Sequence, residues 1–503
     1  MHPRLRLAIL AAAVAVLAVI VGLQVADESY FLGEIVLCGM LWLIAERLQG
    51  PLPDAWVLAV LLVGYIVGNR GFAQLSLLPN FPLLPAEAGL LVCTPILIFR
   101  MAFKQAAALR RDGLNFAILA WMLLGAARLP FDLRQHGFVA LRDSAMVYYA
   151  CFFFIAQAFC RHDASRPLLR RALRIAFLLL PVVSVALSLA PEFFLTIFTW
   201  RGVPLVYHKG DLVATYLASG FFFFWAMWED GAHRLWLIPA AVCLLMSPTM
   251  GSPRAAMFGT AMVTLIWLLA RRPRLLLFQA GAVTAGLSAA LLVLAFYENR
   301  DLRETTAYSV YEHAISIVDF EGKGTYLHTE TGDPGNNNRF RLVWWNSVAH
   351  ETLEKGPVFG LGFGADLAAR FLADYNLVEA EDFVTRSPHS VIMTVFGRMG
   401  TLGLLLFLTI AAMMARSTTL AFRRRDFEAM GLWSVVWVLW LSACFGVVLE
   451  GPMGAVVFWT ILGMANATSV AEQEQPEAED AASRAPTAAD SPAAPLPKAG
   501  AAV

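Results

Sequence analysis

Long apolar runs recur along almost the whole chain, from Leu5 to Ala465. A helix of about 20 apolar residues crosses the hydrocarbon core of a bilayer, and roughly fourteen such runs can be counted. Hydrophobic residues make up 58% of the chain and charged residues 15%, which leaves too little polar surface to cover a water-soluble domain. The runs are continuous and do not alternate, which favours helices over barrel strands. The sequence therefore predicts an all-α polytopic membrane protein with about 14 transmembrane helices.

Positively charged residues gather in alternate connections between these runs. Clusters lie near residues 100–111, 161–174, 271–274 and 416–425. Because cytoplasmic loops are enriched in Lys and Arg, we expect these connections and both chain ends to be cytoplasmic. The long connection at 298–388 is then expected on the opposite side of the membrane.

These patterns predict four segments. Residues 1–297 form an N-terminal transmembrane helix bundle, 298–388 a large external loop with amphipathic helices, and 389–466 the C-terminal transmembrane helices. Residues 467–503 are rich in Ala, Pro and acidic residues, a composition typical of a disordered tail. An external loop of roughly 90 residues is unusually long, and loops of that length are generally functional or disordered.

The stretch "NNRFRLVWWNSVAHETLEKG" in the external loop has the pattern of a helix, with Asn338 as a possible cap and Gly356 at its end. Arg341 precedes Trp345 by one turn, so the guanidinium and the indole are expected on one face, and Trp345 is a candidate for binding a substrate. Arg339 points differently and is the weaker candidate for binding a substrate. The alternative is an ordinary amphipathic helix with a solvated arginine.

The next stretch, "GPVFGLGFGADLAARF", has glycines at 360, 362 and 364 ahead of a helical pattern. Bare backbone amides at a helix start attract anions, so Gly362 is a candidate for substrate binding. The alternative, glycines that let the loop pack tightly against a helix, is the better supported of the two.

A proline and a histidine, Pro388 and His389, come directly before the apolar run that starts in "SPHSVIMTVFGRMGTLGLLLFL". An imidazole with a pKa near about 6.5 suits proton transfer near neutral pH. We expect His389 in the first turn of the helix, where the helix dipole favours the neutral form. The alternative is an interfacial histidine that only caps the helix.

Four motifs taken in order, "SPRAAMFG", "NNRFRLVWW", "GPVFGLGFG" and "SPHSVIMTVFG", resemble the O-antigen ligase and polysaccharide polymerase superfamily of bacterial polytopic membrane glycosyltransferases. The resemblance covers about residues 250 to 410. It implies that Arg254, Arg341 and His389 are the functional arginines and histidine. Ser390 departs from the pattern, because the family often has Asn after the histidine, and this bears on the hydrogen bonding of the imidazole.

The resemblance also implies the reaction and its setting. Family members take a polyprenyl-diphosphate-linked glycan as donor at the periplasmic face of the bacterial inner membrane, in lipopolysaccharide or exopolysaccharide biosynthesis. A ligase transfers the glycan to a lipid A core, whereas a polymerase transfers it to another lipid-linked repeat unit. We favour the ligase, and keep open a polymerase, a transporter or flippase of lipid-linked glycans, and a non-catalytic partner. The expected partners are the donor, the acceptor and the bilayer, with no nucleic acid.

Glycosyl transfer from a diphosphate needs a base and cations for the departing diphosphate. Guanidinium groups bind phosphate in a bidentate way, so arginines can replace a metal ion. The external loop lacks Asp-x-Asp, and the six cysteines of the chain show no CxxC spacing, so neither a metal nor another cofactor is expected. Arg142, next to Asp143, is a further candidate for binding substrate. The other external cations that could line a groove, or contact lipid headgroups, are Arg128, Arg134, Arg201 and Lys209.

Overall fold

The computed structural model describes residues 52–76, 83–102, 110–251, 253–296, 303, 305–319, 324, 326–327, 334–374 and 386–483. The apolar run that begins at Leu5 lies outside these residues, as does the acidic group at 379–382. The described chain is almost entirely helical.

The first part of the fold comprises short and long helices in sequence order: α3 (Pro53–Val63), the π-helical turn η1 (Gly64–Gly68), α4 (Arg70–Ala73), α5 (Pro85–Ala102), α6 (Gly113–His136), α7 (Phe138–Asp143), α8 (Ala145–Tyr148), α9 (Cys151–Cys160) and α10 (Ser165–Leu189). The middle part follows: η2 (Phe193–Ile197), the two-stranded hairpin of β1 (Thr199–Trp200) and β2 (Val203–Pro204), α11 (Gly210–Glu229), η3 (Arg234–Trp236), α12 (Leu237–Met246), η4 (Ser247–Thr249), α13 (Arg254–Leu269) and α14 (Arg274–Phe296). The last part holds α15 (Thr306–Ser316), α16 (Pro334–Lys355), α17 (Ala369–Asp374), α18 (Val391–Arg424), α19 (Phe427–Cys444) and α20 (Pro452–Ser483).

Seven of the described helices are long and apolar enough to cross a membrane, and four shorter apolar helices accompany them. Several present apolar side chains outward: Leu277 and Leu292 of α14 are 70% and 63% exposed, as lipid-facing residues would be. The protein is therefore a multi-pass helical membrane protein, as predicted. The count of about fourteen spans stays a prediction.

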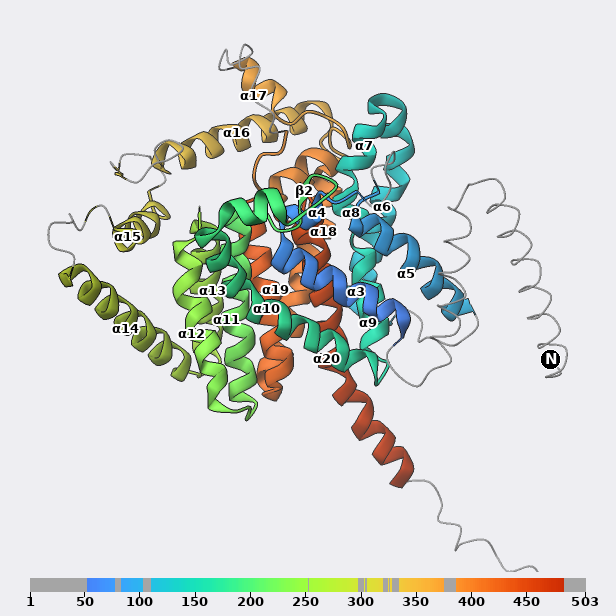
Figure 1. Ribbon diagram of the computed structural model, residues 1–503. Helices are drawn as coiled ribbons and strands as arrows, with labels where there is room; N and C mark the ends of the chain where they lie inside the picture. The colour runs from blue at the N-terminus through green and yellow to red at the C-terminus, as the bar shows by residue number, and fades with distance from the viewer. Residues whose placement is uncertain are drawn as a thin grey trace, which may run out of the picture.

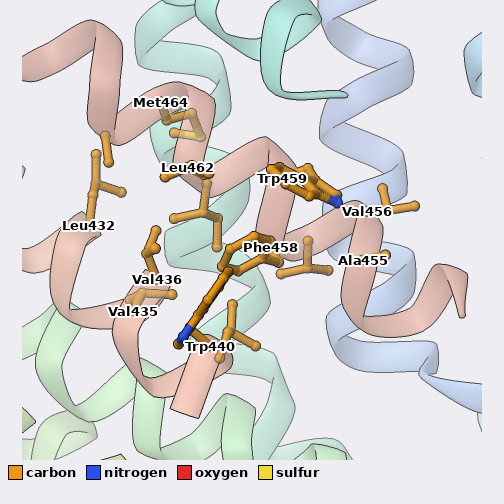
Figure 2. Packing of buried hydrophobic residues seen from close by; sticks show 14 of the residues in the cluster. Leu432, Val435, Val436, Trp440, Ala455, Val456, Phe458, Trp459, Leu462 and Met464 are labelled. Atoms are coloured by element: carbon orange, nitrogen blue, oxygen red, sulfur yellow. The ribbon is translucent and has the colours of Figure 1, made fainter. Parts of the chain in front are cut away.

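The interior of the bundle is built by helices α9, α11, α19 and α20, most of whose described residues are buried (Figure 1). Figure 2 shows apolar side chains of α19 and α20 packed face to face, among them Trp440 and Phe458. The Trp440 ring also stacks on Phe407 of α18, with centroids 4.4 Å apart. Gly463 of α20 lets the backbones approach closely, because a Cβ there would lie 2.3 Å from the Phe153 carbonyl oxygen. Small residues at helix crossings commonly serve this purpose in membranes.

The two ends of the bundle are built differently. At one end Arg166 and Arg170 pair with Glu428, and Arg272 lies 3.5 Å from Glu229. Helices α16 and α17 lie across the other end (Figure 1). Which end faces the cytoplasm stays a prediction.

The segment at 334–374 has a small core of its own. Trp344 and Val348 of α16 pack on Leu367, Ala368 and Phe371, and all five are buried. The Trp344 ring stacks on Phe371 at 5.6 Å and its Nε1 donates to the Leu367 carbonyl at 2.8 Å. The expected helix in this loop is therefore present and ends at Lys355, directly before Gly356.

Helix α18 is broken at Gly400, whose φ of 64° and ψ of −163° are not helical. The glycine-rich loop docks on the break: the Leu361 N–H donates to the Gly397 carbonyl at 2.7 Å and the Thr401 N–H to the Pro357 carbonyl at 2.9 Å. Backbone groups freed by a broken helix inside a membrane protein need such partners. The loop and the helix therefore form one unit.

The C-terminal helix α20 continues to Ser483. The segment expected to be disordered from residue 467 thus begins as helix, because its many Ala, Glu and Gln residues have high helix propensity. Residues 484–503 lie outside the described residues.

Candidate active site

A cavity of about 480 Å³ opens at the end of the bundle beneath α16. It is lined where the first turns of α11 and α13, the middle of α16, the start of α18 and the end of α19 converge. The charged and polar residues that line it are Lys209, Asp211, Thr215, Arg254, Asn338, Arg341, His389 and Ser442. The principal apolar residues are Phe258, Leu342, Trp345 and Phe445.

The conformation of His389 is unusual for a residue with a Cβ, because its φ of 54° lies in the left-handed region. We expected His389 in the first turn of the helix, and this expectation is wrong. Ser390 is the N-cap and its side chain accepts from the Met393 N–H, so His389 lies one residue before the cap. The turn is held from α16, because Trp345 Nε1 donates to the Pro388 carbonyl at 2.6 Å. A strained backbone of this kind persists only where its surroundings fix it.

The pKa of His389 is lowered to about 4, chiefly by burial and further by the positive charges of Arg341 and Lys209, while Asp211 opposes the shift. The imidazole is therefore neutral at pH 7. A neutral imidazole can accept a proton, which an imidazolium cannot.

Arg341 projects from α16 into the same cavity. Its Nη1 donates to the Phe445 carbonyl at 2.8 Å, and its buried Nε has no hydrogen-bond partner among the described residues. Burial and the charge of Arg254 lower its pKa to about 10, so the guanidinium stays charged at neutral pH. A buried donor without a partner is costly in an empty cavity and is available to an anionic ligand.

Arg254 is the first residue of α13. Its Nη1 donates to Asn338 Oδ1 at 3.0 Å, and Asn338 Nδ2 donates to the Ser316 and Asp319 carbonyls at 2.8 and 3.0 Å. Asn338 lies inside α16 and is not its cap, because that helix begins at Pro334. One side chain thus links the bundle, the end of α15 and α16.

The two adjacent tryptophans of α16 serve different surfaces. Trp344 is fully buried in the small core, whereas Trp345 lines the cavity with Arg341, one turn away. The shared face of Arg341 and Trp345 therefore agrees with the helical spacing. Phe445 extends this apolar wall, with its ring centroid 6.4 Å from that of Trp345 and 5.3 Å from that of Phe258.

Three further candidates from the sequence do not line the cavity. Arg339 is exposed on α16. Arg142 has a side chain 69% exposed and lies 3.5 Å from Asp143. Gly362 packs against Asp132: its Cβ, if present, would lie 2.6 Å from Asp132 Oδ1, and its N–H donates to the Arg398 carbonyl. The glycines of this loop thus allow close packing. The neighbouring backbone N–H groups of Phe363 and Gly364 donate to the carboxylates of Asp132 and Asp143.

A buried polar network that the sequence did not reveal lies behind the glycine-rich loop. Arg398 of α18 pairs with Asp143, whose Oδ2 accepts from the Gly364 N–H at 3.2 Å. Thr394 donates to Glu450 at 2.8 Å, and burial raises the pKa of Glu450. These residues come from distant parts of the chain, so no local pattern joins them.

Lys209 and Asp211 line the cavity, but the sequence did not predict them as residues of the site. Lys209 was one of several external cations, and Asp211 was not singled out. The available signal was a lysine and an aspartate two residues apart, directly before an apolar run. Within the described ranges no three His, Cys, Asp or Glu side chains are grouped as metal ligands would be.

Comparison with families of proteins matches residues 235–408 to O-antigen ligase. The match includes Arg254, Arg341, Trp345 and His389, so all four lie in the part of the chain that carries the family pattern. No curated protein matches the chain. O-antigen ligases are a family of membrane glycosyltransferase-like enzymes of polysaccharide biosynthesis. Residues 235–408, about a third of the chain, therefore carry the pattern of the O-antigen ligase family.

Proposed function

We propose that this protein transfers a glycan from a polyprenyl-diphosphate-linked donor to a sugar hydroxyl at the periplasmic face of the bacterial inner membrane. One observation carries the proposal: Arg254, Arg341 and His389, far apart in the sequence, line one cavity. The family match covers all three. The acceptor we propose is a lipid A core, as the description of the family as a ligase favours.

The arginines are suited to hold the diphosphate. Both guanidinium groups face one cavity, and the Nε of Arg341 is left without a partner in the described residues. Preorganised cations that meet charge as it develops on the leaving group lower the barrier of the transfer. Arginine performs this task without a metal ion, because it is always charged and binds phosphate oxygens in pairs.

His389 is suited to be the general base. The acceptor hydroxyl attacks the anomeric carbon, its proton passes to an imidazole nitrogen, and the bond from that carbon to the diphosphate oxygen breaks. The neutral imidazole can accept this proton. Because the cations lower the pKa of His389, a bound diphosphate that neutralises them would raise this pKa and strengthen the base.

Trp345, Phe258 and Phe445 provide an apolar wall beside the charged groups. Such a surface suits the face of a sugar ring or the first isoprene units of the donor. Arg339, Arg142 and Gly362 are left out of the proposed site because they do not line the cavity. The division into 1–297, 298–388, 389–466 and 467–503 is kept as the proposed domain organisation.

A gene-deletion glycan profile tests the function. Accumulation of long polyprenyl-linked chains beside a bare lipid A core is the result expected of a ligase. Accumulation of single repeat units would identify a polymerase, and trapping of those units on the cytoplasmic face would identify a transporter and remove the proposed site.

A further inference from the structure

Two charged residues from a different part of the chain enter the same cavity. Lys209 directly precedes α11 and Asp211 is in its first turn, and Lys209 Nζ lies 3.1 Å from Asp211 Oδ2. The two side chains are 31% and 29% exposed, so the pair is partly buried. Both residues line the cavity with Arg254, Arg341 and His389.

The backbone under this pair is fixed from α3 and its π-helical turn. Asn69 is fully buried, and its Oδ1 accepts from the Lys209 N–H at 3.0 Å. The Tyr207 N–H donates to the Gly68 carbonyl at 3.1 Å, and His208 Nε2 lies 2.9 Å from the Val67 carbonyl. These contacts fix the backbone that carries the two charged side chains.

The residue between the two charges is also constrained. A Cβ on Gly210 would lie 2.7 Å from the Gly251 carbonyl oxygen and 2.8 Å from its Cα. The bare backbone lets this segment approach the turn that leads into Arg254. The Lys209–Asp211 pair is thereby held beside the arginines and not directed away from them.

We propose that Lys209 is a third cation for the diphosphate of the donor, and that Asp211 is a positioning residue that stabilises the imidazolium formed on His389. This inference rests on the proposed function. The charged groups that act on His389 are Arg341, Lys209 and Asp211, and Asp211 alone among them is negative.

The charges of the reaction fit this assignment. Among the described residues, three cations and one carboxylate line the cavity, a net charge of +2. A donor diphosphate esterified at both ends carries one negative charge on each phosphate. When the bond to the sugar breaks, the diphosphate gains one further negative charge, and the proton from the acceptor gives His389 one positive charge. The carboxylate of Asp211 then stabilises the imidazolium, while the ammonium group of Lys209 stabilises the charge on the diphosphate.

The proposed role of Lys209 is tested by measuring, by calorimetry, how tightly the full-length protein in detergent binds farnesyl diphosphate. Lys209→Met and Lys209→Gln are expected to weaken binding about tenfold or more, and Lys209→Arg to retain it. Arg201→Met, on the neighbouring hairpin and outside the cavity lining, is the matched control and should bind as the wild type does. Equal affinity of the wild type and both neutral variants would overturn the assignment of Lys209.

Aspartate at 211 is tested by the pH profile of transfer. Asp211→Asn removes a negative charge that raises the pKa of His389, so the acidic limb of kcat/KM should move to lower pH while farnesyl diphosphate binds at least as tightly. Asp230→Asn, at the other end of α11, should leave the profile unchanged. An unmoved limb in Asp211→Asn would overturn its role. If the wild type itself neither binds farnesyl diphosphate nor transfers glycan, the proposed function fails, whereas a failure confined to the variants removes only this pair.

Discussion

Arg254 and Asn338, 84 residues apart in the chain, are joined by a hydrogen bond of 3.0 Å from Nη1 to Oδ1. The amide of Asn338 is held in turn by two carbonyls at the end of α15. The segment that carries α15 and α16 therefore orients a cation that the helix bundle supplies. The site is completed only when α16 lies on the bundle.

The first prediction concerns this link. Asn338→Ala removes the acceptor of Arg254 and both contacts to α15, so we expect kcat/KM for the donor to fall about tenfold, mainly through a higher KM. Steady-state transfer by purified protein measures it. Asn346→Ala, exposed on the same helix, is the control and should behave as the wild type does. A variant of Asn338 with unchanged KM would contradict the proposed link.

His389→Gln should lower kcat by about a hundredfold or more, because an amide cannot take the proton of the acceptor. Binding of farnesyl diphosphate should be retained, since the cations are intact. His350→Gln, exposed on α16, serves as the matched control. Undiminished transfer by well-folded His389→Gln would exclude the imidazole from the reaction.

The pH dependence follows from the charges around His389. In the free protein its pKa is about 4, so the reactivity of the imidazole toward diethyl pyrocarbonate should be constant at neutral pH and fall only as the pH drops through that value. Arg341→Gln removes a nearby positive charge, so the pKa should rise and the fall should begin at higher pH. Mass spectrometry of the modified peptide follows this without requiring activity. A fall at the same pH in both proteins would refute the coupling.

The contact of the glycine-rich loop with the broken helix predicts a stability difference. Gly360→Ala places a Cβ 2.5 Å from the Gly400 nitrogen at a φ of 77°, whereas Gly137, at a φ of 60°, has nothing within 4 Å. Gly137→Ala should therefore cost about 1 kcal/mol of backbone strain, and Gly360→Ala several times more, because the loop must move. Thermal unfolding in detergent compares them, and equal losses would show that the loop is not tightly packed.

The ion pair of Arg398 and Asp143 is buried, with side chains 4% and 7% exposed. Removing one partner, as in Asp143→Asn, leaves an uncompensated buried charge and should destabilise the protein by about 3–5 kcal/mol. Asp143→Asn combined with Arg398→Met should recover part of this loss. If the double variant loses as much unfolding free energy as the two single variants together, the two residues act independently.

Local patterns were sufficient for much of this protein. Hydropathy over about 20 residues predicts membrane helices because each segment must by itself be apolar and long enough to cross the bilayer. The spacing of Arg341 and Trp345 predicts their common face. The order of the motifs identified the family, and the three residues it implied line one cavity. The end of α16 before Gly356 also followed from the sequence.

Only the tertiary structure decided how the site is assembled. The left-handed backbone of His389 depends on Trp345, which binds the Pro388 carbonyl, and the break at Gly400 depends on a loop some 40 residues earlier in the chain. Lys209 and Asp211 enter the cavity because Asn69 and Gly251 fix their backbone. Each of these contacts joins segments that no periodicity relates, since a helical repeat records which face of a helix is apolar and not which distant segment covers it.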